Sequence, residues 1–302
     1  MKHTSKNRPT SRRSKATPQR RRSRPCLEQL EERCLPSVSP TDFRPITEVG
    51  NNQANPNWGA ANTDLLRLSP VAYADGISAP SLPNNSSARV ISDIINNQAD
   101  PADLSQDLET IDQNGLSDFG YVWGQFIDHD MDLTPTDSGE FDNIVADPND
   151  PSHMATQTFE RSSFDPNTGT STNNPRQQVN AVTSYLDLSN VYGSTQAVAN
   201  ALRTFSGGLL KTSPGNMLPF DNLDYFTQDQ IDALDMADSG PLPESELYAA
   251  GDVRANENTE LTSLTTLFVR NHNAIATELA QTDPTQFGLS SWTDETLYQE
   301  AR

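Results

Sequence analysis

The sequence predicts a mainly α-helical fold, and three segments support this prediction. Apolar residues recur at helical spacing over residues 119–131, just after the turn-forming pair Asn114 and Gly115, and again over residues 261–279. The third segment is DETLYQEAR, a run of helix formers on which the 302-residue chain ends. We therefore expect helices to be the main regular elements and this last helix to continue to the end of the sequence.

Charge is distributed very unevenly along the chain. Of 21 Lys and Arg residues, 11 lie within the first 34 positions, against 3 of the 41 acidic residues. The remainder is strongly acidic, which disfavours nucleic acid and anionic lipid as partners and favours cations. No run approaches the roughly 18 apolar residues of a membrane span, so none is expected.

Residues 1–40 are predicted to form a separate, disordered leader, with the folded domain occupying residues 41–302. The leader is basic, contains both cysteines (Cys26 and Cys34) and lacks the apolar stretch of an ordinary signal peptide. Basic tails often bind polyanions, so nucleic-acid binding is an alternative for this segment alone. The text LEQLEERCLPS resembles the leader of many exported planctomycete proteins, which implies an exported, extracellular or cell-envelope protein from such a bacterium.

Two long stretches, residues 42–99 and 134–179, are rich in Asn, Pro, Ser, Asp and Thr. This composition favours loops over packed elements. Within them, only Val90–Ile95 has the pattern of a short regular segment.

The first chemical pattern is GQFIDHDMD at residues 124–132. On a helix, Gln125, Asp128 and His129 share one face, whereas Asp130 points about 100° further round. One face can therefore meet a ligand while Asp130 serves another site. A solvated acidic turn with a lone histidine is the simpler alternative.

A calcium loop is a further alternative for this segment. Asp128, Asp130 and Asp132 imitate the start of an EF-hand. The match then fails, because Leu133 stands where glycine is needed and Gly139 where glutamate is needed.

The second pattern is TSYLDLS at residues 183–189. In an extended loop, Thr183, Asp187 and Ser189 fall on one side. A carboxylate from elsewhere, such as Asp130, would complete an oxygen set suited to a hard cation. Alternatively, the hydroxyls only satisfy a turn.

The third pattern is GDVRANEN at residues 251–258, just before the predicted long helix. Arg254 and Glu257 could simply form a surface ion pair. His272, on the apolar face of that helix, has the position of a core histidine.

Taken in order, GQFIDHDMDLTP, TSYLDLSNVYGST and GDVRANENTELTSLTTLFVRNHNAIATEL resemble three successive signatures of the animal-type haem peroxidases. The resemblance covers about residues 45–302. It implies a predominantly helical domain that holds haem b between a distal and a proximal histidine. It also implies hydrogen peroxide and a small reducing substrate, a halide, pseudohalide or organic donor, as partners.

The resemblance assigns roles to individual residues. His129 matches the distal histidine that moves the proton of peroxide, Arg254 the distal arginine, and Gln125 the residue beside bound water or halide. Asp128 and Glu257 match the carboxylates that become ester-linked to haem. Asn258 stands where some members have the methionine of a sulfonium link, so we expect a less oxidising haem and bromide, iodide, thiocyanate or phenols rather than chloride as donors.

The family's calcium ligands match residues of the first two patterns. Their implied set comprises side-chain oxygens and the Tyr185 backbone carbonyl: Asp130, Thr183, Tyr185, Asp187 and Ser189. Because Asp130 follows His129 directly, such an ion would stabilise the distal helix.

The family's proximal histidine has no match here. The four histidines are His3, His129, His153 and His272, and His272 belongs to a motif in which it is not the iron ligand. We therefore expect an N-terminal part of the domain, truncated before its proximal half and inactive by itself. Two alternatives are a fatty-acid dioxygenase on the same scaffold and a non-catalytic, calcium-stabilised adhesion or matrix module.

Overall fold

The computed structural model describes residues 43–81, 88–89, 99–100, 103–107, 114–136, 139–145, 155–237 and 240–302. The chain divides into Met1–Ser39 and Pro40–Arg302, and the description concerns the second unit. The basic leader with its two cysteines, the segment Val90–Ile95 and His153 all lie outside the described residues.

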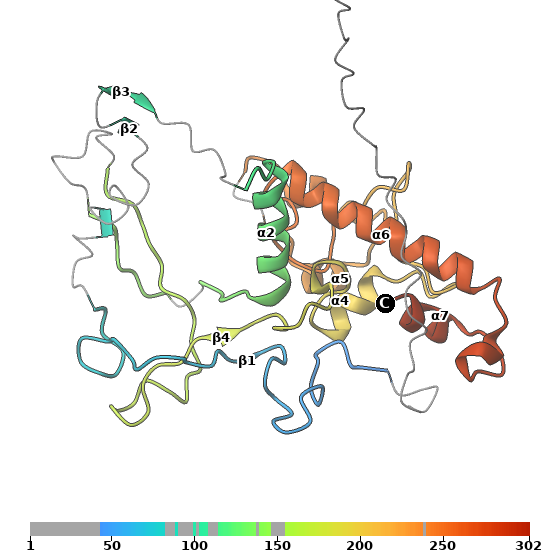
Figure 1. The fold of residues 1–302 in the computed structure, drawn as a ribbon, viewed down its shortest axis with the longest axis horizontal. Helices are drawn as coiled ribbons and strands as arrows, with labels where there is room; N and C mark the ends of the chain where they lie inside the picture. The colour runs from blue at the N-terminus through green and yellow to red at the C-terminus, as the bar shows by residue number, and fades with distance from the viewer. Residues whose placement is uncertain are drawn as a thin grey trace, which may run out of the picture. The chain divides into compact units, whose positions relative to one another are not determined.

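Helices are the main regular elements of the described chain (Figure 1). The α-helices are α2 (Phe119–Met131), α3 (Ser189–Tyr192), α4 (Gln196–Leu202), α5 (Gln228–Leu234), α6 (Thr259–Leu279) and α7 (Asp294–Ala301). Two 3₁₀ turns, η2 (Glu244–Glu246) and η3 (Pro284–Phe287), lie on either side of α6 in the sequence. The mainly α prediction is confirmed.

The strands are short and form two antiparallel pairs. β1 (Thr63–Asp64) pairs with β4 (Val179–Asn180), and β2 (Ala99–Asp100) pairs with β3 (Asp103–Asp107). The first pair connects two loop-rich stretches that the sequence predicts as irregular.

Helix α6 is the longest element and has the apolar face that the sequence predicts. It begins after Asn258, whose side-chain oxygen accepts a hydrogen bond from the Leu261 N–H at 2.8 Å, an ordinary N-cap. Leu261, Leu264 and His272 are all buried. Helix α7 begins in the same way, after the capping side chain of Thr293.

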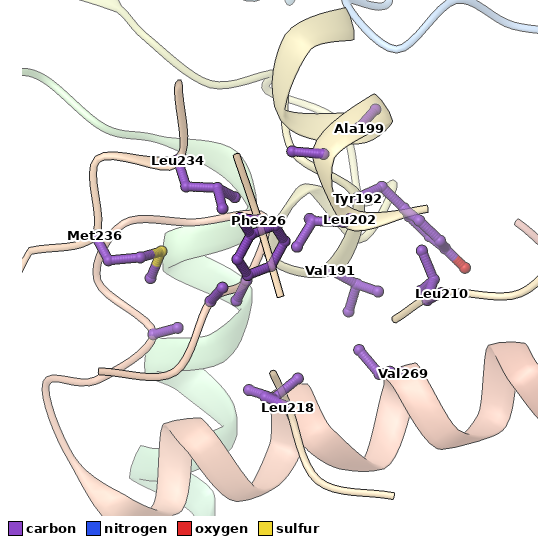
Figure 2. Packing of buried hydrophobic residues seen from close by; sticks show 14 of the residues in the cluster. Val191, Tyr192, Ala199, Leu202, Leu210, Leu218, Phe226, Leu234, Met236 and Val269 are labelled. Carbon is purple, nitrogen blue, oxygen red and sulfur yellow. The ribbon is translucent and has the colours of Figure 1, made fainter. Parts of the chain in front are cut away.

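The main core lies where α3, α4, α5 and the middle of α6 meet (Figure 2). Three aromatic rings, from Tyr192, His272 and Tyr298, contact one another edge to face, with centroids 5.4–6.0 Å apart. Both ring nitrogens of His272 are engaged, one with the Tyr192 hydroxyl at 3.0 Å and the other with the Gly208 carbonyl at 2.8 Å. His272 is therefore a satisfied core residue.

A smaller cluster fixes α2 against α6. It contains Val122 and Phe126 from α2, and the Phe126 ring stacks on Phe268 with centroids 5.2 Å apart. The helical spacing of the apolar residues over 119–131 predicts one buried face that includes Phe119 and Trp123, yet these two residues are 55% and 42% exposed. Only the middle of the expected face is covered by α6.

No helix within the described ranges is both long and apolar enough to cross a bilayer.

Candidate active site and cation cluster

The packing of α2 on α6 brings the second half of α2 beside the loop that precedes α6. The side-chain amide of Gln125 donates to a Glu257 carboxylate oxygen at 2.9 Å, and its carbonyl accepts from the Asn258 amide at 2.8 Å. His129 Nε2 lies 3.6 Å from the same Glu257 oxygen. Residues that are more than 120 positions apart thus form one surface, which we call the histidine face: Gln125, Asp128, His129, Arg254 and Glu257.

Arg254 is held in place at the end of α2. Its Nε and Nη2 atoms donate to the two carboxylate oxygens of Asp252 at 2.9 and 2.8 Å. Nη2 also donates to the backbone carbonyls of His129 at 3.1 Å and Asp132 at 2.8 Å. The guanidinium is therefore fixed next to His129 by contacts that leave little freedom of orientation.

The imidazole of His129 is buried, and its pKa is lowered. The residue is 6% exposed. Burial is the largest cause that lowers the pKa of the imidazole, and the positive charge of Arg254 is the next. The carboxylates of Asp252, Glu257 and Asp128 oppose this shift. A base with a lowered pKa stays unprotonated near neutral pH and is able to accept a proton.

The histidine face has the features expected of a surface that receives a bound group. Buried Nδ1 of His129 has no hydrogen-bond partner, and a Cβ added at Gly124 would meet no atom within 4 Å. Asp128 and Glu257 are exposed. Two accessible carboxylates, an imidazole whose Nδ1 atom has no partner and an open helix surface at Gly124 fit the residues expected from the sequence to hold haem.

On the other side of α2, Asp130 is buried and bonded within the chain. One carboxylate oxygen accepts from the Leu188 N–H at 3.2 Å and the other from the Ser189 hydroxyl at 3.1 Å. Leu188 adopts a left-handed backbone conformation, with φ 61°, which is unfavourable for a branched residue. Backbone strain thus lies between two of the expected cation ligands, Asp187 and Ser189.

Asp187 adds a second buried carboxylate. It accepts hydrogen bonds from the Thr183 hydroxyl at 2.9 Å and the Ser189 N–H at 3.0 Å. Burial is the main cause that raises its pKa to about 7, and the charges of Asp130 and Glu48 add to the effect. Asp130, Thr183, Asp187 and Ser189 therefore form the cation cluster, a buried group of oxygens with excess negative charge.

Tyr185 is positioned differently from its neighbours. Its hydroxyl donates to the Trp58 carbonyl at 3.1 Å, and its ring lies over Gly59, where a Cβ would come within 2.8 Å of it. The described residues contain no group of three His, Cys, Asp or Glu side chains arranged around a metal position. Two carboxylates, two hydroxyls and a backbone carbonyl nevertheless fit a calcium ion, which prefers oxygen ligands of mixed kind.

The cation cluster and the loop that carries Arg254 are in direct backbone contact. The Gly251 N–H donates to the Asn190 carbonyl at 2.9 Å. A Cβ at Gly251 would lie 2.2 Å from the Ser189 carbonyl oxygen and 2.3 Å from the Gly193 nitrogen. No larger residue fits there without moving one of the two segments.

Several residues that shape these sites are not predicted by the sequence analysis. Asp252 lies two residues before Arg254 within the third pattern, and that spacing is the only sequence signal for its role. Arg44 lies 3.6 Å from Asp187 and pairs with the fully buried Glu48. No local pattern connects Arg44 with a loop more than 140 residues away.

Comparison with known proteins identifies the family. The animal haem peroxidase family model matches residues 43–302. Rat thyroid peroxidase is 34% identical over 92% of this chain and 33% of its own length, and human myeloperoxidase is 33% identical over 86% of this chain and 37% of its own.

Solved structures give the same picture. Peroxidase A from Dictyostelium discoideum aligns with a TM-score of 0.67 at 28% identity, covering 86% of this chain and 49% of that one. A fatty acid alpha-dioxygenase from Arabidopsis thaliana aligns with a TM-score of 0.61 at 20% identity, which shows a shared fold. The chain spans about a third of the length of both thyroid peroxidase and myeloperoxidase, and it belongs to the animal haem peroxidase family.

Proposed function

We propose that this chain forms the distal side of a haem peroxidase that reduces hydrogen peroxide and oxidises a small donor. The observation that supports the proposal most strongly is His129, a buried imidazole with a lowered pKa, fixed beside the Arg254 guanidinium on an otherwise open surface. Acid–base catalysis on peroxide needs this combination of a neutral base and a fixed positive charge.

Each residue of the histidine face has a distinct role in this proposal. Nε2 of His129 accepts a proton from the near oxygen of peroxide and returns it to the oxygen that departs. The Arg254 charge stabilises the negative charge that develops on the departing oxygen, and Asp252 keeps the guanidinium in position. Gln125, oriented by Glu257 and Asn258, holds water or the donor beside His129.

The proposed cofactor is haem b, with Asp128 and Glu257 as the carboxylates for ester links. When bound, haem supplies the redox chemistry of the two-electron reduction of peroxide. Asn258 caps α6 and bonds Gln125, and it has no sulfur for a third link. This supports bromide, iodide, thiocyanate or phenols as donors in preference to chloride.

Calcium is proposed as the structural ion of the cation cluster. Its double positive charge would offset the buried carboxylates of Asp130 and Asp187, and the Tyr185 carbonyl would add a ligand. The ion would then hold the end of α2 against the residue 183–189 loop. Export to the cell envelope or beyond, inferred from the leader, belongs to the same proposal.

The axial ligand of the iron is proposed to come from sequence other than the described residues. Of the two described histidines, His129 is on the distal side, and both nitrogens of His272 are already bonded in the core. His3 and His153, which lie outside the described residues, match no iron ligand of the family by motif either. Residues 1–302 by themselves are therefore proposed to bind haem weakly and to be no more active than free haem. No specific observation favours dioxygenase activity, since a likeness at 20% identity concerns the fold.

The test compares two proteins loaded with haem and calcium. One is residues 1–302, and the other is the product of the complete gene, with any coding sequence after Arg302 translated. We expect one haem per chain and peroxide-dependent oxidation of bromide or a phenol in the complete product. If that product is no more active than free haem, the proposal is wrong and a non-catalytic, calcium-stabilised module replaces it. A stable one-to-one complex with rapid turnover in residues 1–302 would instead contradict the missing axial ligand.

A further inference from the structure

Asp221 has a buried carboxylate that nothing in the described chain neutralises. The residue is 1% exposed, and neither carboxylate oxygen has a partner within hydrogen-bonding geometry. Across the described ranges, no Lys, Arg or His forms an ion pair with it. A buried carboxylate in this situation is strongly disfavoured unless a proton or a cation compensates for it.

The surroundings of Asp221 are acidic. It lines a cavity of about 470 Å³ together with Asp224 and Glu244. Burial is the main cause that raises the pKa of Asp221 to about 6. Glu244 adds to that rise through its negative charge and through a side-chain interaction, and the charge of Asp235 adds further, whereas the Met236 N–H opposes the rise. The cavity thus concentrates negative charge around a buried carboxylate that no basic side chain of the described residues pairs with, which is an environment that attracts a cation.

The backbone around Asp221 is fixed by the main core. The Asp221 N–H donates to the Leu247 carbonyl at 2.9 Å. Phe226, Leu234 and Met236, which follow along the chain, are buried in the core cluster (Figure 2). The fold therefore holds the position of the Asp221 carboxylate. No third acidic side chain among the described residues converges with Asp221 and Glu244 on a metal position, so water would have to supply the other ligands of a cation.

We propose that Asp221 is the inner ligand of a second cation site, separate from the cation cluster of Asp130, Thr183, Asp187 and Ser189. Glu244 would bind from the rim of the cavity, Asp224 would add charge, and water would fill the remaining positions. All candidate ligands are oxygens in an irregular arrangement, which suits Ca²⁺ better than Mg²⁺ because Mg²⁺ demands near-octahedral geometry. The ion would fasten the 219–226 loop to the η2 turn.

The experiment counts calcium ions bound to residues 1–302. Wild type, Asp221→Asn and Asp229→Asn are stripped with chelator, titrated with Ca²⁺ by calorimetry, and analysed for bound metal after dialysis. Asp229 is exposed on α5 and lines no part of the cavity, so Asp229→Asn is a control for the loss of one negative charge. We expect Asp221→Asn to bind one calcium fewer than wild type and the control to match wild type.

Two further variants separate this site from the cation cluster and from misfolding. Asp187→Asn should keep the ion that Asp221→Asn loses. Glu244→Gln changes an exposed rim residue that cannot unfold the core, and it should weaken one binding step at least about tenfold while leaving the far-UV circular dichroism unchanged. Equal calcium content and affinity in wild type, Asp221→Asn and Glu244→Gln would overturn the proposal, and Asp221 would then be neutralised by a proton. Tighter binding of Mg²⁺ than of Ca²⁺ would overturn the assignment of the ion.

Discussion

The two sides of helix α2 differ in how far the chain itself completes them. Asp130, on one side, is buried and accepts hydrogen bonds from Ser189 and Leu188. On the other side, Asp128 is exposed, and the Nδ1 atom of His129, next along the helix, has no partner. Along the three consecutive residues 128–130, the helix therefore turns from a solvent-exposed side to a side that is buried against the rest of the chain.

From this difference we expect the cation cluster to support folding and the histidine face to bind a ligand. The cation cluster is assembled from one helix and one loop, and its hydroxyls and N–H groups are already satisfied in the chain. In the histidine face, Arg254 is likewise held by several hydrogen bonds, but the carboxylates of Asp128 and Glu257 are exposed to solvent. Substitutions on the two sides should therefore affect different properties, stability on one and chemistry on the other.

The largest effect is expected on the open side, from His129→Ala in the haem-loaded complete gene product. Loss of both proton acceptance and proton return should slow the reaction with hydrogen peroxide by at least about 100-fold. Haem content should stay unchanged, because His129 is not an anchor for the iron. Stopped-flow absorbance after mixing with peroxide measures the rate, and a variant within tenfold of wild type would remove His129 from the mechanism.

On the closed side, Asp187→Ala or removal of calcium should lower stability. An ion that binds only the folded state adds about 2.7 kcal/mol at a free concentration of about 100 times its Kd. Asp187→Ala should lose much of this calcium-dependent gain and retain haem less well, because the end of α2 loses its support. Differential scanning calorimetry with and without calcium provides the measurement. If Asp187→Ala melts like wild type in both conditions, the 183–189 loop is an ordinary turn.

A pH effect should arise in the core, away from both sides of α2. Burial, the largest cause, and then the charge of Arg203 lower the pKa of His272 below its ordinary value. The unfolded chain therefore binds more protons near pH 6 than the folded chain does, so stability present above about pH 6.5 is lost as the pH falls. His272→Gln should have a lower stability at pH 7.5 but a flatter decline between pH 7 and 5. Urea unfolding at several pH values tests this, and equal slopes would assign the decline to other groups.

The smallest effect on stability is expected from Asp128→Asn. Measured beside Asp130→Asn, it compares the exposed and the buried side of α2 directly. Asp128 is exposed, so its substitution should change the free energy of unfolding by less than about 0.5 kcal/mol. Asp130 is buried and bonded, and the same chemical change there should cost more and weaken calcium binding. Denaturant titration of both variants measures the difference. Equal losses would show that the two sides of α2 are not separate in the way described.

The sequence predicts the helices better than it predicts their surroundings. Residues 119–131 and 259–279 form helices because the 3.6-residue apolar period is a local signal. That period does not reveal which part of the face another element covers, and Phe119 and Trp123 are accordingly exposed. Coverage depends on long-range packing, which no window of the sequence contains.

The same limit applies to the candidate sites. The three motifs predict the candidate residues, and helical spacing places Asp130 on a different face of the helix from Gln125 and His129. The convergence of Gln125 and His129 on Glu257, however, joins positions more than 120 residues apart. Asp221 lies in a loop without any motif, and no sequence pattern predicts its role. What distinguishes Asp221 is that its carboxylate is buried without a basic partner, and this is a property of the folded structure.

Gly251 couples the cation cluster directly to the loop that carries Arg254, so that the two should move together. Its missing side chain lets the backbone of residue 251 rest against the backbone of α3, with no layer of side chains between them to absorb movement. A shift of α3 when an ion enters or leaves would be passed on to the segment that leads, three residues later, to Arg254. The calcium ion proposed for the cation cluster would then also set the position of Arg254, the positive charge that we propose acts on peroxide.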